Sequence, residues 1–352
     1  MKTYATLALV GLVASLALLA PRGAAAADAP ELELQWKRHF AFGPAGARAA
    51  VTPDGALYVG DDNGFVVRLD ARSGEELWRH DAGARVRSAP VVWNDFVIFG
   101  DGGGTITALR STDGTQAWLN ETGLEVLGRV RVSGEVVLAS STDGYLYALY
   151  AWDGNTIWRY NMQQPASTRP AVGGGMVVCT ADRGRAAGLA PGDKRVAWEY
   201  LSGSSPLTAP LIIGDTVVFA ADRGALYGIN LNQGTYQWKR MAGAPIAHGL
   251  AARGQVVFYT TEKGEVAAFD IKGHRELWRV APAQDAGRTP GGAPAMVRGL
   301  LFVPFDEAEL FALDPATGDT VWSFREDVLA PGAFADLTAG GDWIAAPNEN
   351  GY

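Results

Sequence analysis

Five arginines gather in the segments that precede apolar strands in three consecutive stretches of the chain. They are Arg85, Arg87, Arg129, Arg131 and Arg169. Guanidinium groups that converge from neighbouring segments favour carboxylate or phosphate, because each presents a planar fork of N–H donors. These residues therefore predict an anion-binding or acidic-partner site. The alternative is that each arginine pairs with a turn acid of the next of these stretches.

Acidic residues recur in a series of short turns, most of which end in a glycine. They are Asp61, Asp62, Asp101, Asp143, Asp182, Asp222, Glu262, Asp306 and Glu349. Several carboxylate oxygens from one loop can bind Ca²⁺. Asp is also an ordinary turn former, since its side chain bonds to nearby backbone N–H groups. We favour turn formation and predict no metal site.

The remaining reactive residue types form no catalytic pattern. The histidines His39, His80, His248 and His274 lack metal-ligand spacing, and no Gly-x-Ser-x-Gly sequence, phosphate loop or pair of carboxylates suggests a reaction. The single cysteine, Cys179, lies within an apolar strand and is expected to be a buried core residue. We predict no catalytic residue.

Trp152 is the best candidate for contact with a partner. It lies in the turn Ala151-Trp152-Asp153-Gly154, where packing needs are few. Exposed aromatic residues are enriched at protein interfaces. We therefore expect Trp152 to contribute to partner binding.

Eight other tryptophans recur at a near-constant spacing and reveal the elements that position these residues. Neighbours are 40 residues apart, except for gaps of 42 and 44 at the two ends. We call this set the tryptophan column: Trp36, Trp78, Trp118, Trp158, Trp198, Trp238, Trp278 and Trp322. Self-similarity of this period is typical of one supersecondary unit copied along the chain.

Each copy reads as four short strands joined by tight turns. Each copy has an apolar run, which is Phe96–Phe99 in one of them. A tight turn follows the run, and in the next copy this turn is Thr142-Asp143-Gly144, whose glycine supplies a positive φ. A second glycine lies four residues before most of the tryptophans. The Trp ring is expected to fill the space between neighbouring sheets, with its N–H on a backbone carbonyl.

These copies predict an all-β fold, an eight-bladed β-propeller of four-stranded antiparallel blades. Seven copies end at Trp78 to Trp322, and the eighth is split between the two ends of the chain. The strand around Trp36 is expected to close the last blade, which is incomplete at the C-terminus because the chain stops at Tyr352, one residue into its third strand.

The N-terminus reads as an export signal. Lys2 precedes an apolar core from Ala5 to Ala20 and a small-residue exit toward cleavage near Ala26. The expected organisation is a signal peptide at residues 1–26 and one propeller domain at residues 27–352. An uncleaved anchor is the alternative, and we expect no membrane-spanning segment in the mature protein. No cysteine stands at the start of the expected mature chain, where a lipid would be attached, so we expect no lipoprotein.

The charge excludes one class of partner. The net charge is −8, and removal of Lys2 and Arg22 makes it two units more negative. Nucleic-acid binding requires clustered positive charge, so we expect no nucleic-acid partner.

The unit Gly144–Leu149, followed by the turn and tryptophan seen at Asp314–Trp322, resembles the pyrroloquinoline quinone (PQQ) repeat. The resemblance covers residues 31 to 352 and implies the propeller fold. Quinoprotein dehydrogenases and the assembly factor B subunit of the outer-membrane β-barrel assembly machine both have the propeller that this repeat builds. The dehydrogenases carry long insertions, a vicinal Cys-Cys pair and a calcium-binding acid set, whereas this chain has one cysteine and almost no insertions.

The compact plan is more similar to the assembly factor group. That resemblance implies a periplasmic or secreted, monomeric propeller that binds a protein partner in the cell envelope and is not an enzyme. PQQ and Ca²⁺ are not favoured as cofactors. The alternatives are a PQQ-dependent oxidoreductase and a carbohydrate- or small-ligand-binding propeller.

Overall fold

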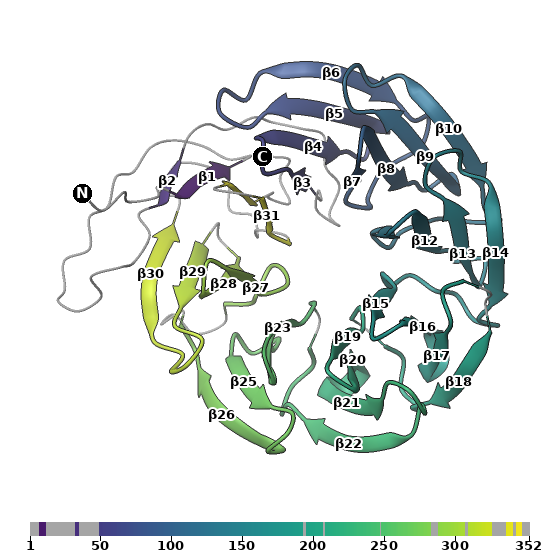
Figure 1. Cartoon of the computed structure of the whole chain (residues 1–352). Helices are drawn as coiled ribbons and strands as arrows, with labels where there is room; N and C mark the ends of the chain where they lie inside the picture. Colours follow the sequence, from purple (N-terminus) through teal and green to yellow (C-terminus); the bar gives the residue numbers. More distant parts are fainter. Residues whose placement is uncertain are drawn as a thin grey trace.

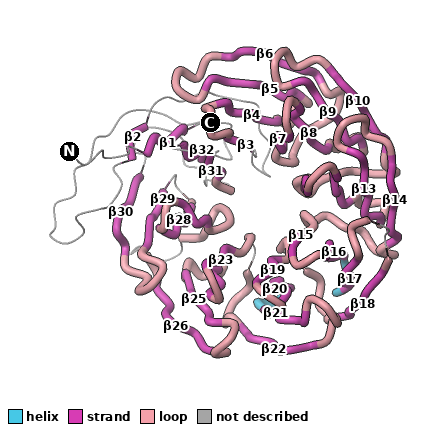
Figure 2. Tube along the Cα trace, in the orientation of Figure 1, coloured by secondary structure: helices cyan, strands magenta, loops and turns pink. Residues whose placement is uncertain are grey.

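The computed structural model describes residues 7–11, 32–34, 49–192, 195–206, 208–246, 248–282, 288–306, 309–325, 336–340 and 343–346. Four-stranded sheets surround a central opening, as in a propeller (Figure 1). Within these residues the helical segments are two single 3-10 turns, Asp182–Gly184 and Asp222–Gly224 (Figure 2). No helix in this described part is long and apolar enough to cross a membrane.

Seven of the sheets are antiparallel blades, each built from four consecutive strands in the order of the sequence. The first strand of each blade lies nearest the central opening, and the fourth forms the outer rim (Figure 1). The blades are β3–β6 (Ala49–Val51, Ala56–Gly60, Phe65–Asp70, Glu76–Asp81), β7–β10 (Val91–Trp93, Phe96–Gly100, Thr105–Arg110, Gln116–Glu121), β11–β14 (Arg131–Ser133, Val136–Ser140, Tyr145–Tyr150, Thr156–Asn161), β15–β18 (Ala171–Gly173, Met176–Ala181, Arg185–Leu189, Val196–Leu201), β19–β22 (Leu211–Ile213, Thr216–Ala221, Ala225–Asn230, Tyr236–Met241), β23–β26 (Ala251–Arg253, Val256–Thr260, Val266–Asp270, Arg275–Val280) and β27–β30 (Ala295–Val297, Leu300–Phe305, Glu309–Leu313, Thr320–Arg325). We number them blades 1 to 7.

The prediction of eight antiparallel blades is wrong, because the propeller has seven. The remaining sheet is mixed: β1 (Leu7–Gly11) pairs in parallel with both β2 (Leu32–Leu34) and β32 (Trp343–Ala346). Blades are antiparallel because tight hairpins join their strands, and no hairpin joins β1 to either neighbour.

The predicted closure by the N-terminal strand is therefore also wrong. That strand, β2, does not reach β32, because β1 lies between them. β1 belongs to the segment that the sequence predicts to be an export signal. Trp36 and the final turn at residues 347–352 lie outside the described residues.

The hairpin of β31 (Thr338–Gly340) and β32 closes the ring between blades 7 and 1. Ile344 packs in one cluster with Phe302 of blade 7. Ala345, the next residue, packs in a different cluster with Val59 of blade 1. Successive strand residues point to opposite faces, so this short strand seals two interfaces at once.

The tryptophan column fills the interfaces between blades, as the sequence predicts. Trp118 of blade 2 is buried, and its indole N–H donates to the carbonyl of Ala151 in blade 3 at 3.0 Å. Trp158 and Trp278 make the equivalent bond to Pro191 and Pro315, at 3.0 and 3.1 Å. The buried apolar surface is therefore divided among the interfaces rather than gathered in one central core.

The glycine four residues before most of the tryptophans is explained by the same contact. A Cβ on Gly154 would lie only 2.4 Å from the ring of Trp118, and the residue has a φ of 71°. The bare backbone therefore lets the preceding blade's indole lie flat against the turn. His274 occupies this position in blade 6 with a φ of 51°, and its ring lies 6.2 Å from that of Trp238.

Cys179 confirms the prediction of a buried core residue. Its thiol is fully buried beside the sulfur of Met162, at 3.2 Å. Burial raises the pKa of this thiol to about 12, because a thiolate would be unsolvated there. The cysteine is therefore protonated and shielded at neutral pH.

Candidate functional site

A central cavity of about 350 Å³ lies where the inner segments of the blades meet. The residue two positions before the first strand lines it in six successive blades, and this inner column recurs with the period of the tryptophans. The inner column consists of Ala89, Arg129, Arg169, Ala209, Gly249 and Ala293, and Asp336 takes the same position before β31. The inner column therefore consists of small residues except for two arginines and one aspartate.

Arg129 and Arg169 are brought together by a close approach of blades 3 and 4. A Cβ on Gly128 would lie 2.8 Å from the carbonyl oxygen of Ser167 and 3.1 Å from the backbone nitrogen of Arg169. The two inner segments are thus in contact at the backbone, and both arginines are half-buried in the cavity wall. The structure places these two predicted site residues in one cavity.

The other predicted arginines do not line this cavity. Arg87 forms a bidentate pair with Asp62, at 2.8 and 3.2 Å, and this carboxylate raises the pKa of the guanidinium. Arg85 forms an ion pair with Glu125. Arg131 is the first residue of β11 and is half-buried. Arg85 and Arg87 therefore pair with acidic residues, but the turn acid that Arg87 binds belongs to the preceding blade rather than the next.

Three of the turn acids, Asp61, Asp101 and Asp143, accept hydrogen bonds from the backbone N–H groups of their own hairpins, as turn formation predicts. The carboxylate of Asp101 accepts hydrogen bonds from the N–H groups of Gly103 and Thr105, at 2.8 and 2.9 Å. Asp143 accepts from Tyr145 N–H at 2.9 Å and from the hydroxyl of Tyr147 at 2.6 Å. Among the described residues, no group of three or more His, Cys, Asp or Glu side chains could hold a metal ion.

Trp152 is exposed in the turn between β13 and β14, with 44% of its surface accessible. Its ring stacks on Tyr150, with a centroid distance of 4.5 Å and an interplanar angle of 25°. Trp152 is therefore accessible to a partner, and its contribution to partner binding stays a prediction.

The outer strands of blades 4 and 5 carry an exposed apolar surface that the sequence analysis did not identify. We call it the apolar rim, and it consists of Val196 and Leu201 on β18 and Tyr236 and Met241 on β22. These side chains are 40%, 69%, 57% and 51% exposed.

The apolar rim differs from the equivalent strands of other blades. Its four residues occupy two columns of the repeat, two residues before and three residues after the tryptophan. Blade 1 has Glu76 and Asp81 in these positions, and blade 2 has Gln116 and Glu121. A comparison of the columns could have found this signal in the sequence.

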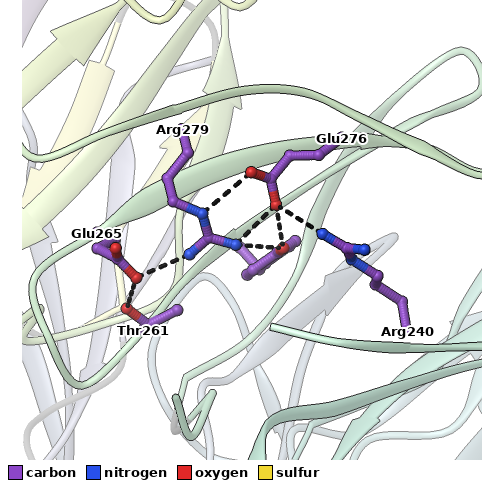
Figure 3. Close-up of polar contacts among 6 residues, drawn as sticks. Arg240, Thr261, Glu265, Glu276 and Arg279 are labelled. Atoms are coloured by element: carbon purple, nitrogen blue, oxygen red, sulfur yellow. Dashed lines mark hydrogen bonds and ion pairs between the residues drawn. The ribbon is translucent and has the colours of Figure 1, made fainter. Parts of the chain in front are cut away.

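The rim of blade 6 shows the opposite chemistry (Figure 3). We call this cluster the polar rim; its members are Arg240, Tyr259, Thr261, Glu265, Glu276 and Arg279. Arg279 lies between two carboxylates, donating to Glu276 through Nε and Nη2 at 3.1 and 2.7 Å and to Glu265 through Nη1 at 2.7 Å. Arg240 of blade 5 lies 3.5 Å from Glu276 Oε2, the oxygen that also accepts from Nη2 of Arg279. The cluster therefore joins two blades.

The charges of the polar rim stabilise one another. The hydrogen bonds from Arg279 lower the pKa of Glu276, and the same contacts raise the pKa of Arg279. A carboxylate held ionised between two guanidinium groups is a poor proton donor or acceptor at neutral pH. We therefore interpret this cluster as an ion-pair network that holds blades 5 and 6 together, rather than as a catalytic site.

The residues do not fit the quinone and calcium set of the dehydrogenases. Cys179 is the single cysteine of the sequence and is buried away from the central cavity. The described residues that line this cavity include no Phe, Tyr or Trp that could stack on a quinone ring. We derive no redox step, and the absence of a cofactor stays a prediction.

Comparison with known proteins identifies the family. The family model described as outer membrane protein assembly factor BamB matches residues 23–134, 122–245 and 210–325, which together span most of the chain. The outer membrane protein assembly factor BamB of Alkalilimnicola ehrlichii is 37% identical over 93 residues, a match that covers 24% of this chain and 24% of that protein.

Solved structures show the same fold. BamB from Moraxella catarrhalis has a TM-score of 0.71 at 19% identity, covering 86% of this chain and 91% of that one. The quinohemoprotein alcohol dehydrogenase of Comamonas testosteroni has a TM-score of 0.68 at 12% identity, covering 86% of this chain and 70% of that one. At these identities the structures establish the propeller, while the matched model decides between the two groups. The chain therefore belongs to the BamB-like family of PQQ-repeat β-propellers.

Proposed function

We propose that this chain is an exported scaffold that binds a protein partner during outer-membrane protein assembly. Membership of the BamB-like family supports this function. The short connections between blades also support it, because they leave the rims and faces of the propeller open to contact. We further propose that the chain acts in the periplasm as a monomeric propeller.

The apolar rim is the observation that carries the proposal. Strands at the edge of a sheet are normally protected by charged side chains, because their outer backbone groups can pair with another chain. β18 and β22 are edge strands of adjacent blades, and both ends of each expose an apolar residue. Large apolar side chains exposed on the edge strands of two adjacent blades favour a partner-binding surface there.

The form of the rim indicates how a partner would bind. An extended segment could add to the edge of β18 or β22 through main-chain hydrogen bonds, with its own apolar residues against Leu201 and Met241. Specificity would then come from the spacing of the two blades. This recognition needs no catalytic group, which agrees with the absence of a catalytic pattern in the sequence.

The proposal is tested in cells that lack the chromosomal copy and carry a plasmid copy. We expect wild type to restore the amount of folded outer-membrane barrels and to co-purify with subunits of the assembly machine. The double variant Leu201→Glu, Met241→Glu should lose most of both, since it puts charge into an apolar contact.

The matched control is Leu77→Glu, Leu277→Glu, which alters leucines that are 49% and 41% exposed on β6 and β26. It should behave like wild type. Unchanged barrel levels in cells without the chain, with no assembly subunit recovered by wild type, would refute the proposed function.

A further inference from the structure

We propose that the central cavity binds a small organic anion through Arg129 and Arg169, by its carboxylate or phosphate group. This site is separate from the apolar rim and goes beyond the proposed function. The inner column contains Ala or Gly in blades 2, 5, 6 and 7, where small side chains leave the cavity open. Arginine replaces them in two adjacent blades.

The contact at Gly128 makes the two arginines act on the same ligand. Because the backbone of blade 3 touches that of blade 4 at Ser167–Arg169, both side chains start from neighbouring points on the wall. Both side chains line the same cavity, so one anionic group in it lies between two guanidinium groups. Their planar forks match the oxygens of carboxylate and phosphate.

The rest of the wall adds hydrogen-bond donors. Thr208 is buried in the wall, and its hydroxyl oxygen accepts the N–H of Ala220 at 2.9 Å, which leaves the hydroxyl hydrogen to donate. His248 lines the same cavity from blade 6.

Asp336 adds a carboxylate to the lining of the cavity. It precedes β31, and its carboxylate accepts the N–H of Ala293 at 2.8 Å. Figure 1 shows β31 and β15 on opposite sides of the central opening. A ligand with an anionic group at one end and a hydrogen-bond donor at the other therefore fits best.

The size of the cavity restricts the ligand to a small molecule. A volume of about 350 Å³ lies near the lower limit of small-molecule sites, which run from roughly 300 to 1,000 Å³. The narrow space excludes a folded segment of a partner.

Calorimetric titration of the purified full chain in phosphate-free, low-salt buffer tests the site. The probes are inorganic phosphate and 4-aminobutyrate, which has a carboxylate at one end and an ammonium donor at the other. We expect one-to-one, saturable binding of at least one probe, and the tighter of the two identifies the group that the site prefers. Arg129→Ala and Arg169→Ala should each weaken binding about tenfold or more, because each removes charge-assisted hydrogen bonds.

The inner column also supplies the controls. Ala89 and Ala209 hold the same position in other blades, so both alanine variants should fold, which their thermal unfolding curves verify. Arg131→Ala removes an arginine two residues from Arg129 that does not line the cavity, and should bind the probes within about twofold of wild type. No saturable binding of either probe, or an equal loss in Arg131→Ala, would overturn the proposal. Neither result would bear on the apolar rim.

Discussion

The rims of blades 5 and 6 are built from the same repeat and yet meet solvent in opposite ways. In blade 6, Arg279 holds Glu265 and Glu276, and the charged groups of the rim are bonded to each other. In blade 5, as in blade 4, the ends of the outer strand expose large apolar side chains. The same repeat can therefore form one rim whose charged groups bind each other and a neighbouring rim whose apolar side chains are exposed to a partner.

The difference follows from what each rim gains on folding. The polar rim makes its contacts inside this chain, so its residues should contribute to the free energy of unfolding. Leu201 and Met241 keep more than half of their surface exposed, so burying them contributes little without a partner. The comparison therefore separates residues needed for stability from residues needed for binding.

The largest effect is expected from the scaffold beneath both rims. Trp118→Ala removes a buried ring and its hydrogen bond to Ala151, and should lower the free energy of unfolding by about 3–5 kcal/mol in urea denaturation. Trp152→Ala, in the turn that receives Trp118, should cost about 1 kcal/mol or less, because it loses little beyond the stack on Tyr150. Equal losses in the two variants would contradict the role assigned to the tryptophan column.

The polar rim predicts a dependence of stability on pH. The pKa of Glu276 is lowered from its ordinary value of 4.5 in the folded state, chiefly by the hydrogen bonds from Arg279. Its contribution should therefore be complete above about pH 4.5 and disappear as the pH falls through the lower folded pKa. Glu276→Gln should lower the free energy of unfolding by about 1 kcal/mol at pH 7 and by less in acid.

Denaturation series at pH 7 and at successive values below pH 4.5 measure this difference. The control is Glu262→Gln, an exposed glutamate of the same blade, which should stay within about 0.5 kcal/mol of wild type at pH 7. A loss in Glu276→Gln that persists unchanged in acid would show that the carboxylate charge is not what stabilises this rim.

The smallest effect on stability is expected at the apolar rim. Leu201→Glu and Met241→Glu should each change the free energy of unfolding by no more than about 0.5 kcal/mol, because both positions are exposed. Denaturation of the isolated chain at pH 7 checks this. A loss above about 2 kcal/mol would show that these residues support the fold itself.

Much of the fold follows from the repeat, since local turn chemistry and interface packing recur in each copy. Trp118, Gly154 and the carbonyl of Ala151 form one such contact. The sequence predicts the ring between neighbouring sheets and its bond to a carbonyl, and the structure supplies Ala151 and Gly154 as the partners. The closure does not follow, because β1 and β32 pair without a hairpin, and no local pattern specifies which distant strands meet. The repeat count therefore gave one blade too many.

The candidate site was predicted in part for the same reason. The period places Arg129 and Arg169 at equivalent positions in adjacent blades, and their meeting in the central cavity depends on that equivalence. Arg85 and Arg87 have the same charge, but their partners Glu125 and Asp62 depend on side-chain reach, which the spacing does not encode. Val196 and Tyr236 are ordinary strand residues when each copy is considered alone, and the apolar rim emerges only when the columns two residues before and three residues after the tryptophan are compared between copies.

Site-directed photo-crosslinking tests most directly whether the apolar rim is the partner-binding surface. A photoreactive phenylalanine analogue replaces Leu201 or Met241 in one set of cells, and Leu77 or Leu277 in another. We predict crosslinks to a subunit of the outer-membrane assembly machine from positions 201 and 241, and none from 77 and 277. Crosslinks to that machine from 77 or 277, with none from 201 and 241, would contradict the claim.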